Sequence, residues 1–430
     1  MLGLYGLLLR LAWAVVLPYQ FVMARFRGPG GPRPGERLAR AGSLRAACAG
    51  GFWIHAVSVG EVRLAMMLTA ALRRERPGVP IHLTTGTATG RALALDARRT
   101  GEAGAPDSIS YFPIDLPGPL RRFFAAIRPR AILILETELW PNLLVEARRR
   151  DVPLLLVNGR LSPRSFPRYR RIRPLLARTL PHARLFAMQS EEDAGRIREL
   201  GAPVDRVIVT GSLKFDLPLP AADEAAARRR IATDPGVTIF VAGSTARGEE
   251  EAILAAFAAL RRHDPSARLV LAPRHPEDLN AAARALRAAH LRTARYTTVE
   301  TGGPWDALLV DVVGALPQIY AAATVVFVGG SLTKRGGQNL LEPAALGKPV
   351  LFGPHVENFR AAAKSLLAAG GGFVARDATE LGALAVRFAG DPAARSAAGT
   401  GARAVVEANR GALARTLRAI DLALDAPGTR

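Results

Sequence analysis

The segment WIHAVSVGE, residues 53 to 61, places a carboxylate where an apolar strand gives way to an amphipathic helix. Ser58 and Glu61 have the S-x-x-E spacing of a capping box, in which two side chains satisfy free backbone N–H groups at a helix start. A carboxylate at the carboxyl end of a strand can also act as a general base, because open α/β sheets bind their ligands there. Gly60 favours this second role, since glycine costs stability in a first helical turn but leaves the strand end open. The spacing alone leaves both roles open.

Two further segments of the first half carry candidate charges. The segment ILETELWPN, residues 134 to 142, ends an apolar strand with Glu136 and Glu138, which strand alternation would place on one face. Carboxylates at that edge are costly to bury without a partner, so a site is favoured over a core position. Lys214 in GSLKFD ends another apolar run, and it is one of four lysines against 54 arginines. A contact with an anion and a plain salt bridge both explain this lysine.

The second half contains a glycine-rich turn before a helix, in VFVGGSLTKRGGQNLLEPAALGKPVLFGP, residues 326 to 354. Glycines before a helix start near Leu340 would let backbone N–H groups approach a phosphate, whose charge the helix dipole favours. Asn339 and Glu342 again have capping-box spacing. Glu342 could in addition accept hydrogen bonds from ribose hydroxyls. The segment therefore predicts a nucleotide site that is compatible with a helix cap.

Two more strand ends in this half suit an anionic ligand. VAGSTARGEEE, residues 241 to 251, repeats the order of strand, small residues and acidic helix start. LVLAPRHPED, residues 269 to 278, places Arg274 at a strand end, where a guanidinium suits a phosphate or base contact. A surface arginine is the alternative, because arginine is abundant throughout this chain.

Short apolar, β-branched runs position these residues, and a helical pattern follows each run. Continuous apolar strands that alternate with helices are typical of parallel sheets covered on both faces. We therefore predict an α/β protein with two doubly wound, Rossmann-like domains facing a cleft. Prolines in residues 215 to 229 indicate a linker between the domains. The predicted strands lie in FWIHAVSV, VPIHLTT, SISYFPI, AILILETE, VPLLLVNG, RLFAMQS, RVIVTGS, VTIFVAGS, ARLVLAPR, DALLVDVVG, TVVFVGGS, KPVLFGP and GGFVARD.

Composition limits the classes of function. The single cysteine, Cys48, excludes a disulfide framework, and the seven histidines are scattered without the spacing of a zinc site. No D-x-D pair stands at a strand end, so we expect no bound metal. The net charge of +21 favours a polyanionic partner, either nucleic acid or an anionic membrane surface.

The N-terminal segment favours the membrane. Residues 2 to 23 are apolar apart from Arg10 and Gln20, and their number suits one spanning helix. Arg10 and Pro18 also permit a helix that lies in the membrane interface. By the positive-inside rule, the basic residues that follow leave the bulk of the chain in the cytoplasm. These residues are Arg25, Arg27, Arg33, Arg37 and Arg40.

A second basic segment, RLSPRSFPRYRRIRPLLARTL at residues 160 to 180, interleaves arginines with Phe166 and Tyr169. Such a segment is either a solvated basic face or a surface that docks on anionic lipid headgroups. The apolar N-terminus favours docking. The arginines are Arg164, Arg168, Arg170, Arg171 and Arg173.

Taken together, these segments resemble one family, the 3-deoxy-D-manno-octulosonic acid (Kdo) transferases of lipopolysaccharide assembly. The resemblance covers essentially residues 50 to 360, and it rests on the order and spacing of many strings. It implies a GT-B fold, CMP-Kdo as donor substrate with no further cofactor, and the glucosamine disaccharide of a lipid A precursor (lipid IVA) as acceptor. The strings are HAVSVGE, TTGTATG, YFPIDLP, ETELWPN, NGRLS, QSEED, GSLKFD, AGST, APRHPE and GGQNLLEPAALGKPV.

The resemblance also implies roles for individual residues. Glu61 would be the proton acceptor, and Glu136 and Lys214 would stabilise the transition state. Relatives often have G-E-L where this chain has residues 314 to 316, and S-T-H where it has residues 244 to 246. These departures affect individual CMP contacts and leave the reaction unchanged. The implied CMP contacts are Ser244, Pro273, Arg274, Gly314, Ala315, Leu316, Asn339, Leu340, Leu341 and Glu342.

One base without an enzymic nucleophile implies an inverting, metal-independent transfer. We expect a monomer at the inner membrane, with its catalytic domains on the cytoplasmic face and an anionic membrane surface as a partner. The implied organisation is a membrane anchor helix at residues 1–27, an acceptor-binding domain at 28–216, a CMP-sugar-binding domain at 217–405, and a C-terminal helix at 406–430 that packs back on the first domain.

Two alternatives belong to other classes. A different membrane-associated GT-B enzyme that uses a UDP-sugar would share the fold, the anchor and the glycine-rich helix. It would not be expected to share SVGE and ETELWPN together. A nucleic-acid-binding protein would explain the charge, but recognisable nucleic-acid motifs are absent from the sequence, so we expect no nucleic-acid partner.

Overall fold

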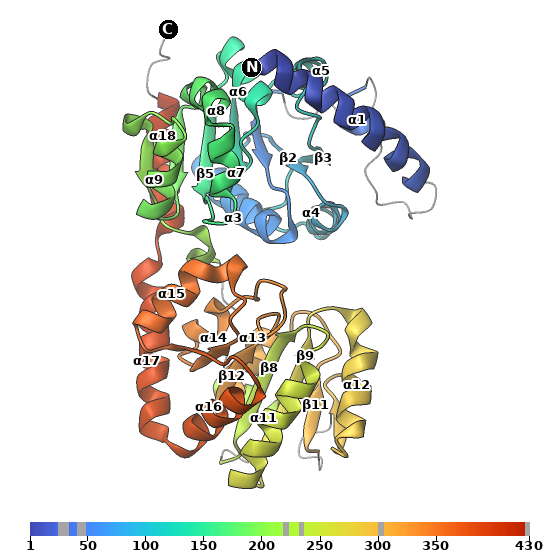
Figure 1. Cartoon of the computed structure of the whole chain (residues 1–430), viewed down its shortest axis with the longest axis vertical. Helices are drawn as coiled ribbons and strands as arrows, with labels where there is room; N and C mark the ends of the chain where they lie inside the picture. The colour runs from blue at the N-terminus through green and yellow to red at the C-terminus, as the bar shows by residue number, and fades with distance from the viewer. Residues whose placement is uncertain (25–33, 41–48, 218–222, 232–235, 300–304, 426–430) are drawn as a thin grey trace. The chain divides into compact units, whose positions relative to one another are not determined.

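The computed structural model divides into two compact units, of residues 1–217 with 411–430 and of residues 218–410 (Figure 1). It describes residues 1–24, 34–40, 49–217, 223–231, 236–299 and 305–425. Side chains are described for residues 1–16 and 35–40 of the N-terminal part. The basic residues Arg25, Arg27 and Arg33, and residues 218–222 of the expected linker, lie outside the described residues.

The first unit is built on a parallel seven-stranded sheet of order β3-β2-β1-β4-β5-β6-β7. The strands are β1 (Phe52–His55), β2 (Ile81–Thr85), β3 (Ser108–Tyr111), β4 (Ala131–Leu135), β5 (Leu154–Gly159), β6 (Leu185–Met188) and β7 (Val207–Val209). The helices are α1 (Leu2–Ala24), α2 (Pro34–Arg37), α3 (Val59–Glu75), α4 (Ala88–Thr100), α5 (Pro117–Ile127), α6 (Pro141–Arg149), α7 (Phe166–Arg171), α8 (Arg173–Thr179), α9 (Glu191–Glu199) and α18 (Ala412–Asp425), with a short 3-10 helix η3 (Leu213–Asp216).

The second unit is built on another parallel seven-stranded sheet, of order β10-β11-β9-β8-β12-β13-β14. Its strands are β8 (Ile239–Thr245), β9 (Arg268–Pro273), β10 (Thr293–Arg295), β11 (Ala307–Leu309), β12 (Val325–Val328), β13 (Val350–Phe352) and β14 (Gly372–Val374). Its helices are α10 (Glu224–Ile231), α11 (Glu250–His263), α12 (Leu279–Ala288), α13 (Leu316–Ala322), α14 (Leu341–Ala345), α15 (Arg360–Ala368), α16 (Ala378–Gly390) and α17 (Pro392–Asn409).

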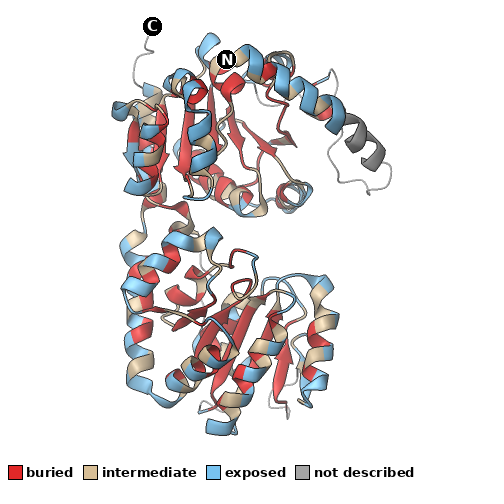
Figure 2. Cartoon of the chain, viewed as in Figure 1, coloured by how far each residue is buried: buried red, intermediate tan, exposed pale blue. Residues whose placement is uncertain are grey.

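Both faces of the first sheet are buried, which explains why its strands are continuously apolar. In β4, Ile132 and Ile134 pack on one side with residues of α5, α6 and α8. Leu133 and Leu135 pack on the other side with residues of α3 and α18. Figure 2 shows the strands of both sheets as buried and the outer faces of the helices as exposed. The prediction of two doubly wound α/β domains is therefore confirmed.

One strand was missed by the sequence-based prediction. β10 is a three-residue strand at the edge of the second sheet, where it pairs with β11. Its residues are exposed or only half-buried. An edge strand of this length needs no apolar run, so the criterion that found the other strands does not apply to it.

Helix α1 contacts the first unit through one face. The hydroxyl of Tyr5 donates a hydrogen bond of 2.9 Å to Asp115 Oδ2, and Trp13 lies beside the Arg37 guanidinium. The opposite face carries exposed apolar side chains, namely Leu4, Leu7, Leu8, Leu11 and Val15. Over the part of the chain that the structure describes, no helix combines the length and apolarity that crossing a bilayer requires.

The second basic segment forms α7 and α8. Its aromatic residues Phe166 and Tyr169 pack partly against the core of the first unit, and the Tyr169 hydroxyl donates to the carbonyl of Thr137. The arginines Arg164, Arg168 and Arg171 are exposed. The aromatic side chains therefore hold the segment on the domain, and the arginines supply the charge that faces solvent.

Candidate functional site

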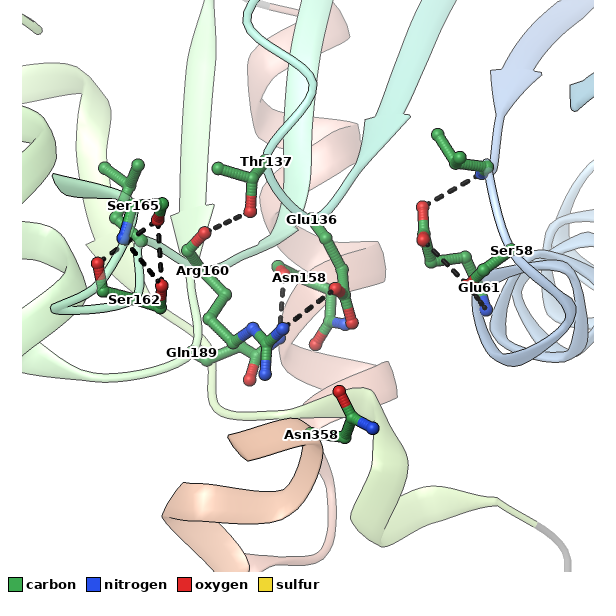
Figure 3. A network of polar contacts seen from close by, with 12 residues as sticks. Ser58, Glu61, Glu136, Thr137, Asn158, Arg160, Ser162, Ser165, Gln189 and Asn358 are labelled. Carbon is green, nitrogen blue, oxygen red and sulfur yellow. Dashed lines mark hydrogen bonds and ion pairs between the residues drawn. The ribbon is translucent and has the colours of Figure 1, made fainter. Parts of the chain in front are cut away.

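The candidate catalytic residues of the first unit lie where the strand order of its sheet reverses. β1 lies between β2 and β4, so the chain winds outward in two directions from the β1–β4 pair. Ligands of doubly wound sheets bind at the carboxyl ends of the strands at such a point. Glu61 follows β1 and Glu136 follows β4. Figure 3 shows both side chains at this edge of the sheet.

Glu61 forms the capping box that its spacing predicts. Ser58 is the N-cap of α3, and its hydroxyl oxygen accepts a hydrogen bond from the backbone N–H of Glu61. The Glu61 carboxylate accepts two hydrogen bonds of 2.9 Å, from the Val57 N–H and from the Ser58 hydroxyl. Burial, and then the nearby charge of Glu136, raise the pKa of the Glu61 carboxyl. A raised pKa suits a general base near neutral pH, so capping and base catalysis are compatible in this residue.

Glu136 is held between two cations. Its Oε1 lies 3.4 Å from Lys214 Nζ, and its Oε2 lies 3.7 Å from Arg160 Nη2. The backbone of Glu136 has a φ of 58°, in the left-handed region that non-glycine residues seldom occupy. Such conformations cost free energy and cluster at functional sites.

We predicted from strand alternation that Glu136 and Glu138 lie on one face of a strand, and this prediction is wrong. β4 ends at Leu135, so neither glutamate continues the strand. The left-handed residue Glu136 turns the chain. Its carboxylate then lies beside Lys214 and Arg160, whereas that of Glu138 lies near His55. Thr137 donates from its hydroxyl to the carbonyl of Arg160, which fixes the turn against the end of β5.

Several hydrogen bonds fix the turn that carries Lys214. Asn158 Oδ1 accepts from the Leu213 N–H at 3.0 Å. Asp216 accepts from the N–H groups of Gly411 and Leu413 at 2.7 and 2.6 Å. The start of α18 therefore holds η3 in place. Lys214 is positioned by contacts of its turn with β5 and with α18.

Glu138 and His55 lie close together at the site, and the sequence did not predict this proximity. Glu138 Oε2 lies 3.9 Å from the Nε2 of the buried His55. Burial, and then the charge of Glu61, raise the pKa of Glu138 to about 7. Burial lowers the pKa of His55 to about 3, so the ring is neutral. No sequence spacing links the two residues, because they come from β1 and from the turn after β4.

In the second unit, the strand order reverses between β8 and β12. Ser244 lies near the end of β8 with a φ of 52°, at an irregularity in the pairing of β8 with β9. Thr245 pairs with Pro273, and its carbonyl accepts from the Arg274 N–H at 2.9 Å. The structure therefore brings Ser244, Pro273 and Arg274 together at one sheet edge.

The other donor candidates belong to two short helices. Gly314 has a φ of 94°, Ala315 is the N-cap of α13, and Leu316 begins that helix. Tyr320 of the same helix is buried close to Ser244. Burial, and then the charge of Glu342, raise the pKa of Tyr320, so α14 contributes to the same neighbourhood.

Asn339 and Glu342 interact as their spacing predicts. Asn339 Nδ2 donates to Glu342 Oε1 at 3.0 Å, and Asn339 Oδ1 accepts from the Leu341 N–H at 3.1 Å. Leu340 is the N-cap, and α14 begins at Leu341. The Asn339 side chain, one residue before the N-cap, therefore satisfies the first backbone N–H of the helix and contacts the carboxylate of Glu342.

A protein carboxylate occupies the first part of the glycine-rich segment after β12, ahead of Gly336, Gly337 and the helix start that were predicted to contact a phosphate. The buried carboxylate of Glu249 accepts hydrogen bonds of 2.8 to 2.9 Å from four backbone N–H groups, and one of 3.4 Å from a fifth. The N–H groups of residues 330–333 are thus satisfied within the protein, and the predicted phosphate contacts before α14 stay a prediction. The acidic run GEEE predicted a helix start but gave no sign of this long-range contact. The five N–H groups belong to Ala246, Gly330, Ser331, Leu332 and Thr333.

The candidates form two groups, one in each unit. Glu61, Glu136 and Lys214 share the carboxyl edge of the first sheet. The ten donor candidates lie at the carboxyl edge of the second sheet or at the starts of α13 and α14. Within the described ranges, no group of three or more His, Cys, Asp or Glu side chains has the arrangement of a metal site.

Solved structures of other proteins have the same fold. A glycosyltransferase from Rickettsia africae matches with a TM-score of 0.58 and 12% identity, over 88% of this chain and 100% of its own. The Staphylococcus aureus MnaA–UDP structure also has a TM-score of 0.58, with 15% identity, over 88% of this chain and 98% of its own. The two doubly wound domains and these matches show that the chain has the GT-B fold.

Sequence comparison gives the family within this class. The family model of 3-deoxy-D-manno-octulosonic-acid transferase (kdotransferase) matches residues 32–217. The 3-deoxy-D-manno-octulosonic acid transferase of Bordetella pertussis is 40% identical over 393 residues, or 90% of each chain. That of Haemophilus influenzae is 36% identical over 315 residues, or 72% of each chain. The chain belongs to the Kdo transferase family, and it is therefore a glycosyltransferase.

Proposed function

We propose that this chain transfers Kdo from CMP-Kdo to a primary hydroxyl on the glucosamine disaccharide of a lipid A precursor, lipid IVA, in lipopolysaccharide synthesis. The observation that carries the proposal is the half-buried carboxylate of Glu61 at the β1 end, where the sheet order reverses. Membership of the Kdo transferase family supports Kdo as the transferred group.

Glu61 acts as the general base. The acceptor hydroxyl gives its proton to the carboxylate while its oxygen forms a bond to the anomeric carbon of Kdo. The bond from that carbon to the CMP oxygen breaks, and CMP leaves with the bonding electrons. A single displacement of this kind inverts the anomeric configuration. The raised pKa of Glu61 favours its part in the reaction, because a more basic carboxylate accepts the proton more readily.

Fixed charges would stabilise the transition state. Lys214 and Arg160 are already ordered around Glu136, so they need little reorganisation as charge develops at the reacting centre. Arg274 suits the phosphate of CMP. The remaining CMP contacts of this proposal are Ser244, Pro273, Gly314, Ala315, Leu316, Asn339, Leu340, Leu341 and Glu342.

Incubation of the protein with CMP-Kdo and lipid IVA tests this function. We expect a product whose mass exceeds that of lipid IVA by one or more Kdo residues, together with released CMP. Free CMP should compete with the donor, whereas UDP should not. Competition by UDP in place of CMP, with no Kdo product, would instead support the alternative of a UDP-sugar transferase.

We further propose that the protein works at the cytoplasmic face of the inner membrane. The exposed apolar side chains of α1 and the exposed arginines of α7 support this location. Apolar side chains insert into the interface, and arginines are attracted to anionic headgroups.

Replacing Arg164, Arg168 and Arg171 together with glutamine should weaken the binding of the full chain to anionic vesicles by roughly 100-fold. Each arginine near such a surface contributes about 1 kcal/mol, and about 1.4 kcal/mol corresponds to a factor of ten. Cosedimentation with vesicles measures the change. The matched control neutralises three exposed arginines of the second unit, Arg262, Arg284 and Arg287. Equal losses in both variants would show that net charge acts without a specific surface.

A further inference from the structure

A cavity of about 150 Å³ lies between α1 and the carboxyl edge of the first sheet. Leu9 and Trp13 of α1 line one side, and Arg37, His55, Glu138 and Trp140 are among the residues that line the rest. A cavity of this volume can hold a single six-membered ring.

Two hydrogen-bond donors at this cavity lack good acceptors within the described chain. The Nε atom of Arg37 is buried without a hydrogen-bond partner. The indole Nε1 of Trp140 is also buried, and it lies close enough to Glu138 to lower that carboxyl's pKa without reaching hydrogen-bond geometry. Buried donors of this kind are uncommon in native structures, and a bound ligand is one way to satisfy them.

Two acceptors face the same space. His55 Nδ1 lies 3.1 Å from the Thr84 carbonyl and 3.0 Å from the Thr84 hydroxyl. The carbonyl only accepts, and the hydroxyl donates to the carbonyl of Ile54, so we assign the proton to Nδ1 and leave Nε2 to accept. Glu138 Oε2 lies 3.9 Å from that Nε2, a gap too wide for a direct hydrogen bond. Acceptors and donors are thus arranged around one small volume.

The charges around the cavity do not favour a phosphate. Arg37 is the cation, while Asp115 and Glu138 are carboxyls. Asp115 is already engaged by the hydroxyl of Tyr5 and by the N–H groups of Asn142 and Leu143. Phe112 completes the lining as a flat apolar wall, with its ring centroid 4.1 Å from His55 and 5.4 Å from Trp140. An apolar wall with a few placed polar groups suits a neutral, hydroxylated ring.

We propose that this cavity is a subsite for one neutral, hydroxylated sugar ring of the acceptor, with Arg37 and Trp140 donating to its oxygens and Glu138 and His55 accepting from its hydroxyls. The proposal rests on the proposed function. Val57 joins the subsite to the base, because it lines the cavity and its N–H donates to Glu61. The subsite would therefore place an acceptor hydroxyl close to Glu61.

Two substitutions in the full-length protein test the subsite. E138Q replaces an acceptor oxygen with an amide, and W140F removes the indole N–H while keeping an aromatic ring beside Phe112. Each should raise the KM for lipid IVA by roughly tenfold, the usual scale for one lost hydrogen bond to a buried group. The KM for CMP-Kdo should stay within twofold of wild type. The matched controls are E75Q, at the exposed end of α3, and W305F, at a buried tryptophan of the second unit.

The outcomes separate the subsite from the reaction. A raised acceptor KM with an unchanged donor KM supports the subsite. An acceptor KM within twofold of wild type in both variants overturns it, even if Kdo transfer is intact. Parallel rises in both KM values also overturn it, because they indicate a general structural defect. Absence of Kdo transfer by the wild-type protein would instead contradict the proposed function.

Discussion

Replacing Glu61 with glutamine should lower the turnover of Kdo transfer by roughly 100-fold or more. Glutamine cannot take the proton from the acceptor hydroxyl. It can nevertheless keep the helix cap, because its amide oxygen can accept from the Val57 N–H and its amide nitrogen can donate to the Ser58 hydroxyl. Turnover measured with saturating CMP-Kdo and lipid IVA reports the expected loss.

Stability and donor binding should hardly change in this variant. A whole helix cap contributes about 1 kcal/mol, and the substitution retains its hydrogen bonds, so the free energy of unfolding should fall by less than that. Thermal unfolding and CMP-Kdo binding measure these two properties. E75Q, on the same helix, makes the same charge change at an exposed position and should leave turnover unchanged.

Near wild-type turnover in the Glu61→Gln variant would make the carboxylate a cap alone. Another base would then be required. Glu136 is a poor second candidate, because Lys214 and Arg160 are paired with its carboxylate. Glu138 would be the better one, since its pKa of about 7 suits proton transfer near neutral pH.

Most of the fold could be predicted because strands that are buried on both faces of a sheet have continuously apolar sequences. β4 shows this relation, since its alternate residues enter separate cores and all five are buried. The same rule could not find β10, which lies at a sheet edge with exposed residues. Local composition indicates which strands are buried. It does not identify a strand that is stabilised by backbone pairing alone.

The candidate site was predictable only where its contacts are local in sequence. The hydrogen bonds of Ser58 with Glu61, and of Asn339 with Glu342, span one helical turn, so spacing alone indicates them. The proximity of His55 to Glu138 depends on the neighbouring positions of β1 and β4 in the sheet, which no single segment encodes. The left-handed backbone of Glu136 is likewise invisible in the sequence, because glutamate seldom adopts it.

Replacing Glu249 with alanine should strongly destabilise the second unit. The fully buried carboxylate joins the start of α11 to the glycine-rich turn after β12 through its contacts with Ala246 and with residues 330–333. Alanine would leave four well-placed N–H groups without a partner. One unsatisfied buried donor costs about 1–3 kcal/mol, although water entering the space would offset part of the sum. We therefore expect a loss of roughly 3–5 kcal/mol in the free energy of unfolding, or about 10 °C in melting temperature.

The Glu249 variant should also lose affinity for CMP, because the turn it orders is continuous with the donor candidates Asn339 to Glu342. E251A is the matched control, since Glu251 lies two residues further along the chain, in α11, and is exposed. The melting temperature of E249Q should lie between those of E249A and the wild type. Its amide oxygen can still accept from two N–H groups, while its amide nitrogen faces the other two. Calorimetric unfolding and CMP titration of the three variants measure both effects.

A melting temperature for E249A equal to that of E251A would contradict this prediction. The turn would then be held by its own backbone contacts, such as that of the Gly337 N–H with the Gly330 carbonyl, and the carboxylate would only fill space.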